Sequence, residues 1–141
     1  MLRSGGGLCQ GADVIRLRRP SSTAPPAALA GALMTTGVLH GVAPRPFDTI
    51  VPPWLPGSAR FWTYASGVAE LAVGAAVAAP RTRRAGALVA AALFVAVFPA
   101  NVQMAWDWRH RPWPYRAIAY GRLPLQWPMI VHALRVSREA R

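Results

Sequence analysis

The chain consists of four apolar stretches separated by polar or proline-rich segments. They cover residues 27–43, 61–79, 86–106 and 123–136, and the first and third contain no Asp, Glu, Lys or Arg. Strands are excluded because the runs are too long, too rich in alanine and lack alternation of period two. Helices of a soluble bundle, which is the alternative fold, would each carry a charged face. The pattern therefore predicts an all-α membrane protein, a bundle of four transmembrane helices.

A proline-rich segment joins the first two apolar stretches. Five prolines fall within residues 44–57, namely Pro44, Pro46, Pro52, Pro53 and Pro56. We expect no regular helix at this proline density. The segment also contains large apolar residues, so we expect this outer loop to lie on the membrane or to re-enter it. Ion pairs of Asp48 with Arg45 and Arg60 would hold the loop in place.

The distribution of arginine predicts the orientation in the membrane. All 16 basic residues are arginine, and with 5 acidic residues they give a net charge of +11. The short turn of residues 80–85 carries three of them, and the positive-inside rule places such a turn in the cytoplasm. We therefore expect both termini in the cytoplasm, with the inverted topology as the alternative. Residues 1–24 form a flexible basic tail, and residues 25–141 form the membrane domain.

Composition excludes several classes of function. The one cysteine, Cys9, excludes an intrachain disulfide, a CxxC redox pair and a cysteine zinc site. We find no glycine-rich phosphate loop and no HExxH, GxSxG or CxxCH motif, so no metal site and no cofactor is evident. The arginines flank the helices and no nucleic-acid motif is present, so the expected partner of this charge is the lipid bilayer. We do not expect the chain to be a catalyst on its own.

Polar residues inside the apolar stretches are candidates for function, because they are costly in lipid. Measured from the outer end of each stretch, Glu70 and His132 both lie nine residues deep, which is about 13–14 Å. His40, Asn101 and Gln126 lie three to five residues deep, in the outer third of the bundle. This placement predicts one polar ligand or proton pocket that opens to the outside.

Glu70 is the first candidate within this pocket. A carboxylate in hydrocarbon must be neutral or paired, and His132 lies at the matching depth. Such a pair would relay a proton to or from a bound quinone headgroup. The alternative is structural, with Glu70 bonded to Ser66 one turn back and the amides joining helices. At the outer rim, Arg60 and Arg122 would contact an anion or lipid headgroups.

Several motifs together resemble one known family. Their order and spacing are similar to those of the DoxX-like family of small bacterial four-helix membrane proteins, over residues 28–136. The motifs are GVLHGVAPRPFDTIVPPWLPG (37–57), SGVAEL (66–71), PRTRR (80–84), FPANVQMA (98–105) and RLPLQ (122–126). The resemblance implies a four-helix protein of the bacterial inner membrane. The founding member is similar to a subunit of a thiosulfate:quinone oxidoreductase, and other relatives are linked to membrane oxidoreductase complexes.

The resemblance implies a membrane subunit or anchor of an oxidoreductase complex, with a partner subunit that supplies the chemistry. The chain departs from this family picture in having no cysteine in its core, so we do not expect it to carry thiol chemistry itself. Binding of a quinone near Glu70 and His132 and docking of the partner subunit both stay open. Two further alternatives are a non-enzymatic scaffold or assembly factor and a small-molecule permease that acts as an oligomer.

Overall fold

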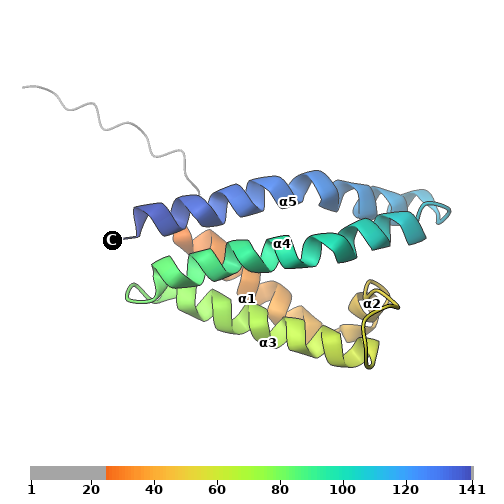
Figure 1. Cartoon of the computed structure of the whole chain (residues 1–141), viewed down its shortest axis with the longest axis horizontal. Helices are drawn as coiled ribbons and strands as arrows, with labels where there is room; N and C mark the ends of the chain where they lie inside the picture. The colour runs from red at the N-terminus through yellow and green to blue at the C-terminus, as the bar shows by residue number, and fades with distance from the viewer. Residues whose placement is uncertain (1–24, 141) are drawn as a thin grey trace, which may run out of the picture.

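The computed structural model describes residues 25–140, in which the chain is entirely helical and forms no strand. The helices are α1 (Pro26–Val42), α2 (Pro44–Asp48), α3 (Ala59–Ala78), α4 (Arg83–Asp107) and α5 (Trp113–Glu139). Four of them are long and run alternately up and down, whereas α2 is short (Figure 1). The all-α prediction is therefore confirmed. The predicted basic tail, residues 1–24 with Cys9, lies outside the described residues.

The long helices pack in the order in which they follow one another along the chain. α1 packs against α3, α3 against α4, and α4 against α5, while α1 and α5 make a smaller contact. The α3–α4 turn lies at one end of the molecule together with the end of α5, and the other two connections lie at the opposite end (Figure 1). A large apolar cluster that includes Leu33, Val77 and Phe94 forms the main core. A smaller one around Met104 and Trp108 closes the loop end of α4 and α5.

Two expectations about the connections are wrong. α2 forms in spite of Pro44 and Pro46, because a proline in the first turn of a helix removes no intrahelical hydrogen bond. The polar segment between the third and fourth apolar stretches, residues 107–122, was expected to be a loop, but α5 begins at Trp113, so most of this segment is helical. Pro114 again lies in the first turn, where its fixed φ angle favours the helix. The first turns of α5 are polar and aromatic, and for this reason the hydropathy pattern did not indicate a helix there.

Glycines allow α1 and α3 to approach each other closely. A Cβ atom on Gly67 would lie 2.7 Å from Cβ of His40, and one on Gly37 would lie 2.8 Å from the carbonyl oxygen of Gly67. Real Cβ atoms do not approach so closely, so only glycine permits this crossing. Three residues beyond these glycines, one helical turn later, are His40 on α1 and Glu70 on α3. The crossing therefore brings these two side chains together.

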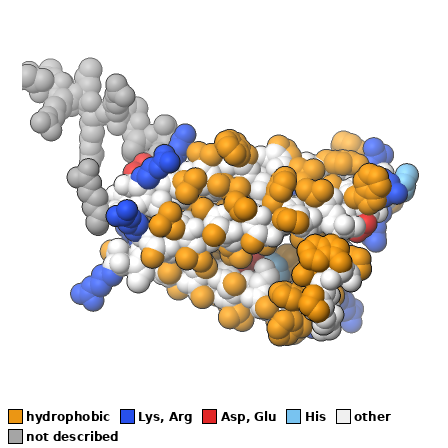
Figure 2. All heavy atoms as spheres, in the orientation of Figure 1, with side chains coloured by type: hydrophobic (Ala, Val, Ile, Leu, Met, Phe, Trp, Pro, Cys, Tyr) orange, Lys and Arg blue, Asp and Glu red, His pale blue; other side chains and the backbone are white. Residues whose placement is uncertain are grey.

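The exposed surface of α3 and α4 is strongly apolar. Within the described residues these two helices are long and apolar enough to span a membrane, and α1 is a shorter apolar helix. Only 28% of the most apolar window of α3 and 33% of that of α4 are buried. Apolar side chains spread over the visible face of the bundle in Figure 2. A core helix of a soluble protein would be mostly buried, so this exposure favours a membrane protein, although two such helices support it only weakly.

We expect Gly67→Ala to lower the free energy of unfolding by about 1–3 kcal/mol, because the added methyl group forces α1 and α3 apart. The measurement is thermal or denaturant unfolding of the purified protein in detergent. Gly31→Ala is the matched control, since nothing lies within 4 Å of its Cβ position. That change should be neutral or stabilise by up to about 1 kcal/mol. Equal stability of the two variants would show that the close crossing is not required.

Candidate functional site

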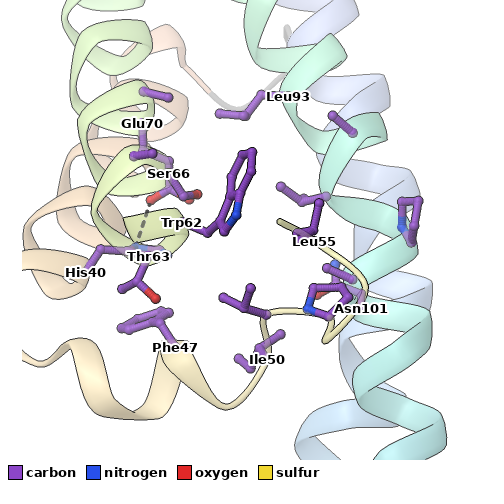
Figure 3. A pocket seen from close by; sticks show the side chains of 18 of the residues that line it. His40, Phe47, Ile50, Leu55, Trp62, Thr63, Ser66, Glu70, Leu93 and Asn101 are labelled. Carbon is purple, nitrogen blue, oxygen red and sulfur yellow. Dashed lines mark ion pairs between the residues drawn. The ribbon is translucent and has the colours of Figure 1, made fainter. Parts of the chain in front are cut away.

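A cavity of about 440 Å³ lies between α3 and α4 at the loop end of the bundle. Side chains of α3 and α4 form its facing walls, and the loop of residues 49–57 forms its roof. The lining is mainly apolar, and in Figure 3 Trp62 projects between the two walls. The volume falls within the range of roughly 300–1,000 Å³ that is typical of sites for small molecules. The cavity is therefore large enough for a ligand headgroup.

The wall formed by α1 and α3 carries a carboxyl–imidazole pair. Nδ1 of His40 lies 3.3 Å from Oε2 of Glu70, and the two side chains are only 11% and 15% exposed (Figure 3). The same Nδ1 lies 2.7 Å from the carbonyl oxygen of Thr36. Because Nδ1 carries a single hydrogen, it donates to the nearer carbonyl, and its attraction to Glu70 is electrostatic. Oε2 has no hydrogen-bond partner within the described residues, so it accepts no hydrogen bond from Ser66.

The ring of His40 is fixed from a second side. Phe47 of α2 stacks on it with 3.8 Å between ring centroids and an angle of 26° between the planes. The imidazole is thus held by the Thr36 carbonyl along its edge and by Phe47 over its face. This double restraint keeps the ring beside Glu70 at the cavity wall.

The opposite wall is held by amides that join α4 and α5. Asn101 is buried, donates from Nδ2 to Oε1 of Gln126 over 2.8 Å, and accepts at Oδ1 from Nε of Arg122 over 3.1 Å. Gln126 in turn donates to the backbone carbonyl of Phe94. This carbonyl neighbours the one that Pro99 leaves without its usual N–H donor in α4. The side-chain amides of Asn101 and Gln126 thus make most of their hydrogen bonds to each other and to groups of α4 and α5. Asn101 also lines the cavity.

The roof is fastened to α3 at both of its ends. Asp48 accepts hydrogen bonds from Nε of Arg60 over 2.9 Å and from Oγ1 of Thr63 over 2.7 Å. At the other end, Nε1 of Trp62 donates to the carbonyl oxygen of Pro56 over 2.7 Å. The hydrogen bonds from Arg60 and Thr63 lower the pKa of Asp48 below its ordinary value of 3.8. Asp48 therefore stays charged at neutral pH and anchors the loop.

The structure brings together most of the residues predicted for the pocket. Glu70, His40 and Asn101 line the cavity, and Gln126 supports Asn101 from behind. His132 does not line it, and the predicted pair of Glu70 with His132 is wrong. His132 lies on α5, which packs against α4 and makes a smaller contact with α1, but makes no contact with α3, the helix of Glu70, within the described residues. The error arose because similar depth along two helices does not make those helices neighbours in the bundle.

The two rim arginines have different roles. Arg122 lines the cavity, whereas Arg60 pairs with Asp48 over 2.7 Å and helps to hold the roof. The predicted anchoring of the loop by Arg60 is therefore confirmed. No ion pair of Arg45 is found among the described side chains.

Sequence reasoning missed several residues that shape the cavity. Trp62 and Ser66 lie four residues apart and Glu70 follows after another four, so all three share one face of α3. This helical spacing was a signal that could have found them. Leu55 and the other roof residues left no such signal, because a loop has no fixed period.

The fold and the cavity together define a small helical-bundle protein with an apolar ligand-sized site and one buried carboxyl–imidazole pair. The chain belongs to a protein family described as domain of unknown function (DUF8561), whose model matches residues 29–137. No curated protein and no solved structure shows a significant match to the chain. The resemblance to the DoxX-like family stays a prediction.

We expect Asp48→Asn to loosen the roof, because the amide loses the charge that attracts Arg60 and cannot accept as strongly from Thr63. Hydrogen exchange of residues 49–57 should become faster. Wild-type anchoring should be present at neutral pH and be lost as pH falls below 3.8 through the lowered pKa of Asp48, since protonation removes the charge. Asp107→Asn, at the same end of the molecule but outside the roof, is the control and should leave this exchange unchanged.

Proposed function

We propose that this chain is a multi-pass protein of the bacterial cytoplasmic membrane that binds a quinone-like apolar ligand and acts as a membrane subunit or anchor of an oxidoreductase complex. The observation that carries the proposal is the cavity with its apolar lining and its buried pair of Glu70 and His40. An apolar cavity with few polar groups suits a molecule with an apolar body and one or two polar atoms. A quinone headgroup has these properties.

The lengths and composition of the helices support the proposed location. α3 and α4 have the length and composition of spanning helices. α1 has 17 residues, at the short end of the range for a span, and the 27 residues of α5 exceed the length that a span requires. With the arginine-rich α3–α4 turn in the cytoplasm, the up-and-down order places both termini there and the cavity toward the outer face.

The segments behind the DoxX-like resemblance also support the proposal. The first one contains His40 and the whole roof, and SGVAEL contains Ser66 and Glu70. FPANVQMA contributes Asn101 to the cavity, and RLPLQ contributes Arg122. Four of the five matching motifs therefore meet at one site, which is expected if the resemblance reflects a shared ligand site.

We predict that Glu70→Gln lowers quinone-linked electron flow in membranes that contain the complex, because the neutral amide cannot exchange a proton or hold a charge beside His40. Oxygen uptake or reduction of an artificial electron acceptor measures this flow. Glu139→Gln makes the same chemical change at the end of α5, away from the cavity, and should leave the flow intact.

Native purification in mild detergent, followed by mass spectrometry of bound proteins and quinones, separates the proposal from its alternatives. Co-purification of a redox partner and a quinone supports the proposal. A stable partner without a quinone, and normal electron flow in Glu70→Gln, would show a scaffold instead. Substrate flux in reconstituted vesicles that is lost in Glu70→Gln would show a permease.

Labelling of single cysteines tests the orientation, after Cys9 has been replaced. A cysteine at Thr82 should resist a membrane-impermeant thiol reagent in intact cells, because the α3–α4 turn faces the cytoplasm. A cysteine at His110, in the α4–α5 connection, should react. The opposite pattern would invert the topology and place the cavity on the cytoplasmic side. Reaction at both positions would contradict a membrane-spanning bundle.

A further inference from the structure

Several hydrogen-bond donors on the α1 and α3 side of the cavity are already in use. Nε1 of Trp62 donates to the carbonyl oxygen of Pro56, and the hydroxyl of Thr63 donates to Asp48. Nδ1 of His40 donates to the carbonyl oxygen of Thr36. These three groups line the cavity, but their protons point to partners within the protein. A ligand in the cavity therefore receives no hydrogen bond from them.

By contrast, a hydrogen-bond acceptor on the same wall, the carboxyl group of Glu70, is not fully used. Oε2 of Glu70 has no hydrogen-bond partner within the described residues, although the carboxyl group is largely buried. A buried carboxyl oxygen without a donor is costly, and native structures rarely leave one so. His40 lies close enough to attract the charge of Glu70 but gives its proton elsewhere. No donor of the described residues reaches Oε2 of Glu70, and a ligand can supply one.

We propose that the ligand presents a hydroxyl group to Glu70, so that the cavity prefers the hydroxyl-bearing, reduced form of a quinone-like molecule to the dione. This inference rests on the proposed function and names the form of the ligand. A hydroxyl group donates to the carboxyl of Glu70 and retains lone pairs that accept from a neighbouring donor. A dione offers only carbonyl oxygens, which cannot satisfy an acceptor.

An ionised Glu70 gives this preference whichever charge His40 carries, because a carboxylate accepts hydrogen bonds and donates none. When the imidazole is neutral, its protonated Nδ1 leaves the lone pair on Nε2, which adds a second acceptor to this wall. When it is protonated, Glu70 is a carboxylate in an ion pair, and a charged acceptor gains most from a hydroxyl donor. A cationic amine would also donate to Glu70. However, Arg122 lines the same cavity and the chain carries a net charge of +11, both of which repel a cation.

Equilibrium binding to the full chain in lipid nanodiscs, under anaerobic conditions, tests the inference with three probes. They are a hydroquinone with a ten-carbon tail, the matching quinone, and the dimethyl ether of the same hydroquinone. The hydroquinone and the quinone are matched in size, so their difference in affinity reports on the hydroxyl groups. The ether keeps the aromatic ring but replaces both donors by methyl groups. We expect the hydroquinone to bind about tenfold more tightly than the other two, as a hydrogen bond to a charged group permits.

Two variants test whether Glu70 is the group that causes the preference for the hydroquinone. Glu70→Gln should reduce it to less than about threefold, because the side-chain amide of glutamine both donates and accepts and so serves either form. Glu139→Gln is the matched control and should retain it. The comparison of the three probes on the wild-type chain needs no variant, so it remains decisive if Glu70→Gln does not fold.

Each outcome has a definite meaning. A tenfold preference that is lost only in Glu70→Gln supports the inference. Equal affinities, or tighter binding of the quinone, would overturn it and leave the proposed function standing. A preference that survives in Glu70→Gln would overturn the role of Glu70. Failure of all three probes to bind would overturn the proposed function, and the inference with it.

Discussion

The close crossing of α1 and α3 is the constraint on which the site depends. Gly37 and Gly67 bring two backbones to a distance that no larger residue permits, and the next turn of each helix carries one member of the carboxyl–imidazole pair. In lipid, packing of this kind holds helices together where no hydrophobic force between them exists. Both the position of Glu70 and the shape of the cavity wall therefore follow from two glycines that take no part in any chemistry.

The hydropathy pattern predicted the architecture well, because long apolar runs without charge leave few alternatives to helices. It gave the all-α class and the four long helices. It also gave three of the lining residues, since Glu70, His40 and Asn101 are conspicuous as polar groups in apolar surroundings. For these residues, the cost of a polar group away from water made the inference possible.

The remaining features depend on contacts that composition does not encode. The start of α5 at Trp113 was missed because its first turns are rich in Arg, Tyr and Trp. His132 was paired wrongly because no pattern within one helix shows that α5 packs against α4 and not against α3. Pairing of His40 with Glu70 depends on the angle at which α1 crosses α3, which no pattern within one helix reveals. The anchor of the roof at Asp48 and Arg60 was predicted, but the full course of the roof was not. Its course is fixed by the hydrogen bonds of Asp48 and of Trp62, which join residues distant along the chain.

If α1 and α3 span a bilayer as proposed, their pairing also bears on how the chain enters it during synthesis. A helix with a buried acidic residue partitions poorly into lipid by itself, at a cost of about 2.5–3.5 kcal/mol for an acidic side chain at its centre. α1 precedes α3 in translation and carries the histidine that meets this residue. Insertion of the two helices as one hairpin would shield the carboxyl group from lipid as it arrives. The contact that shapes the mature cavity would then also ease the biogenesis of the protein.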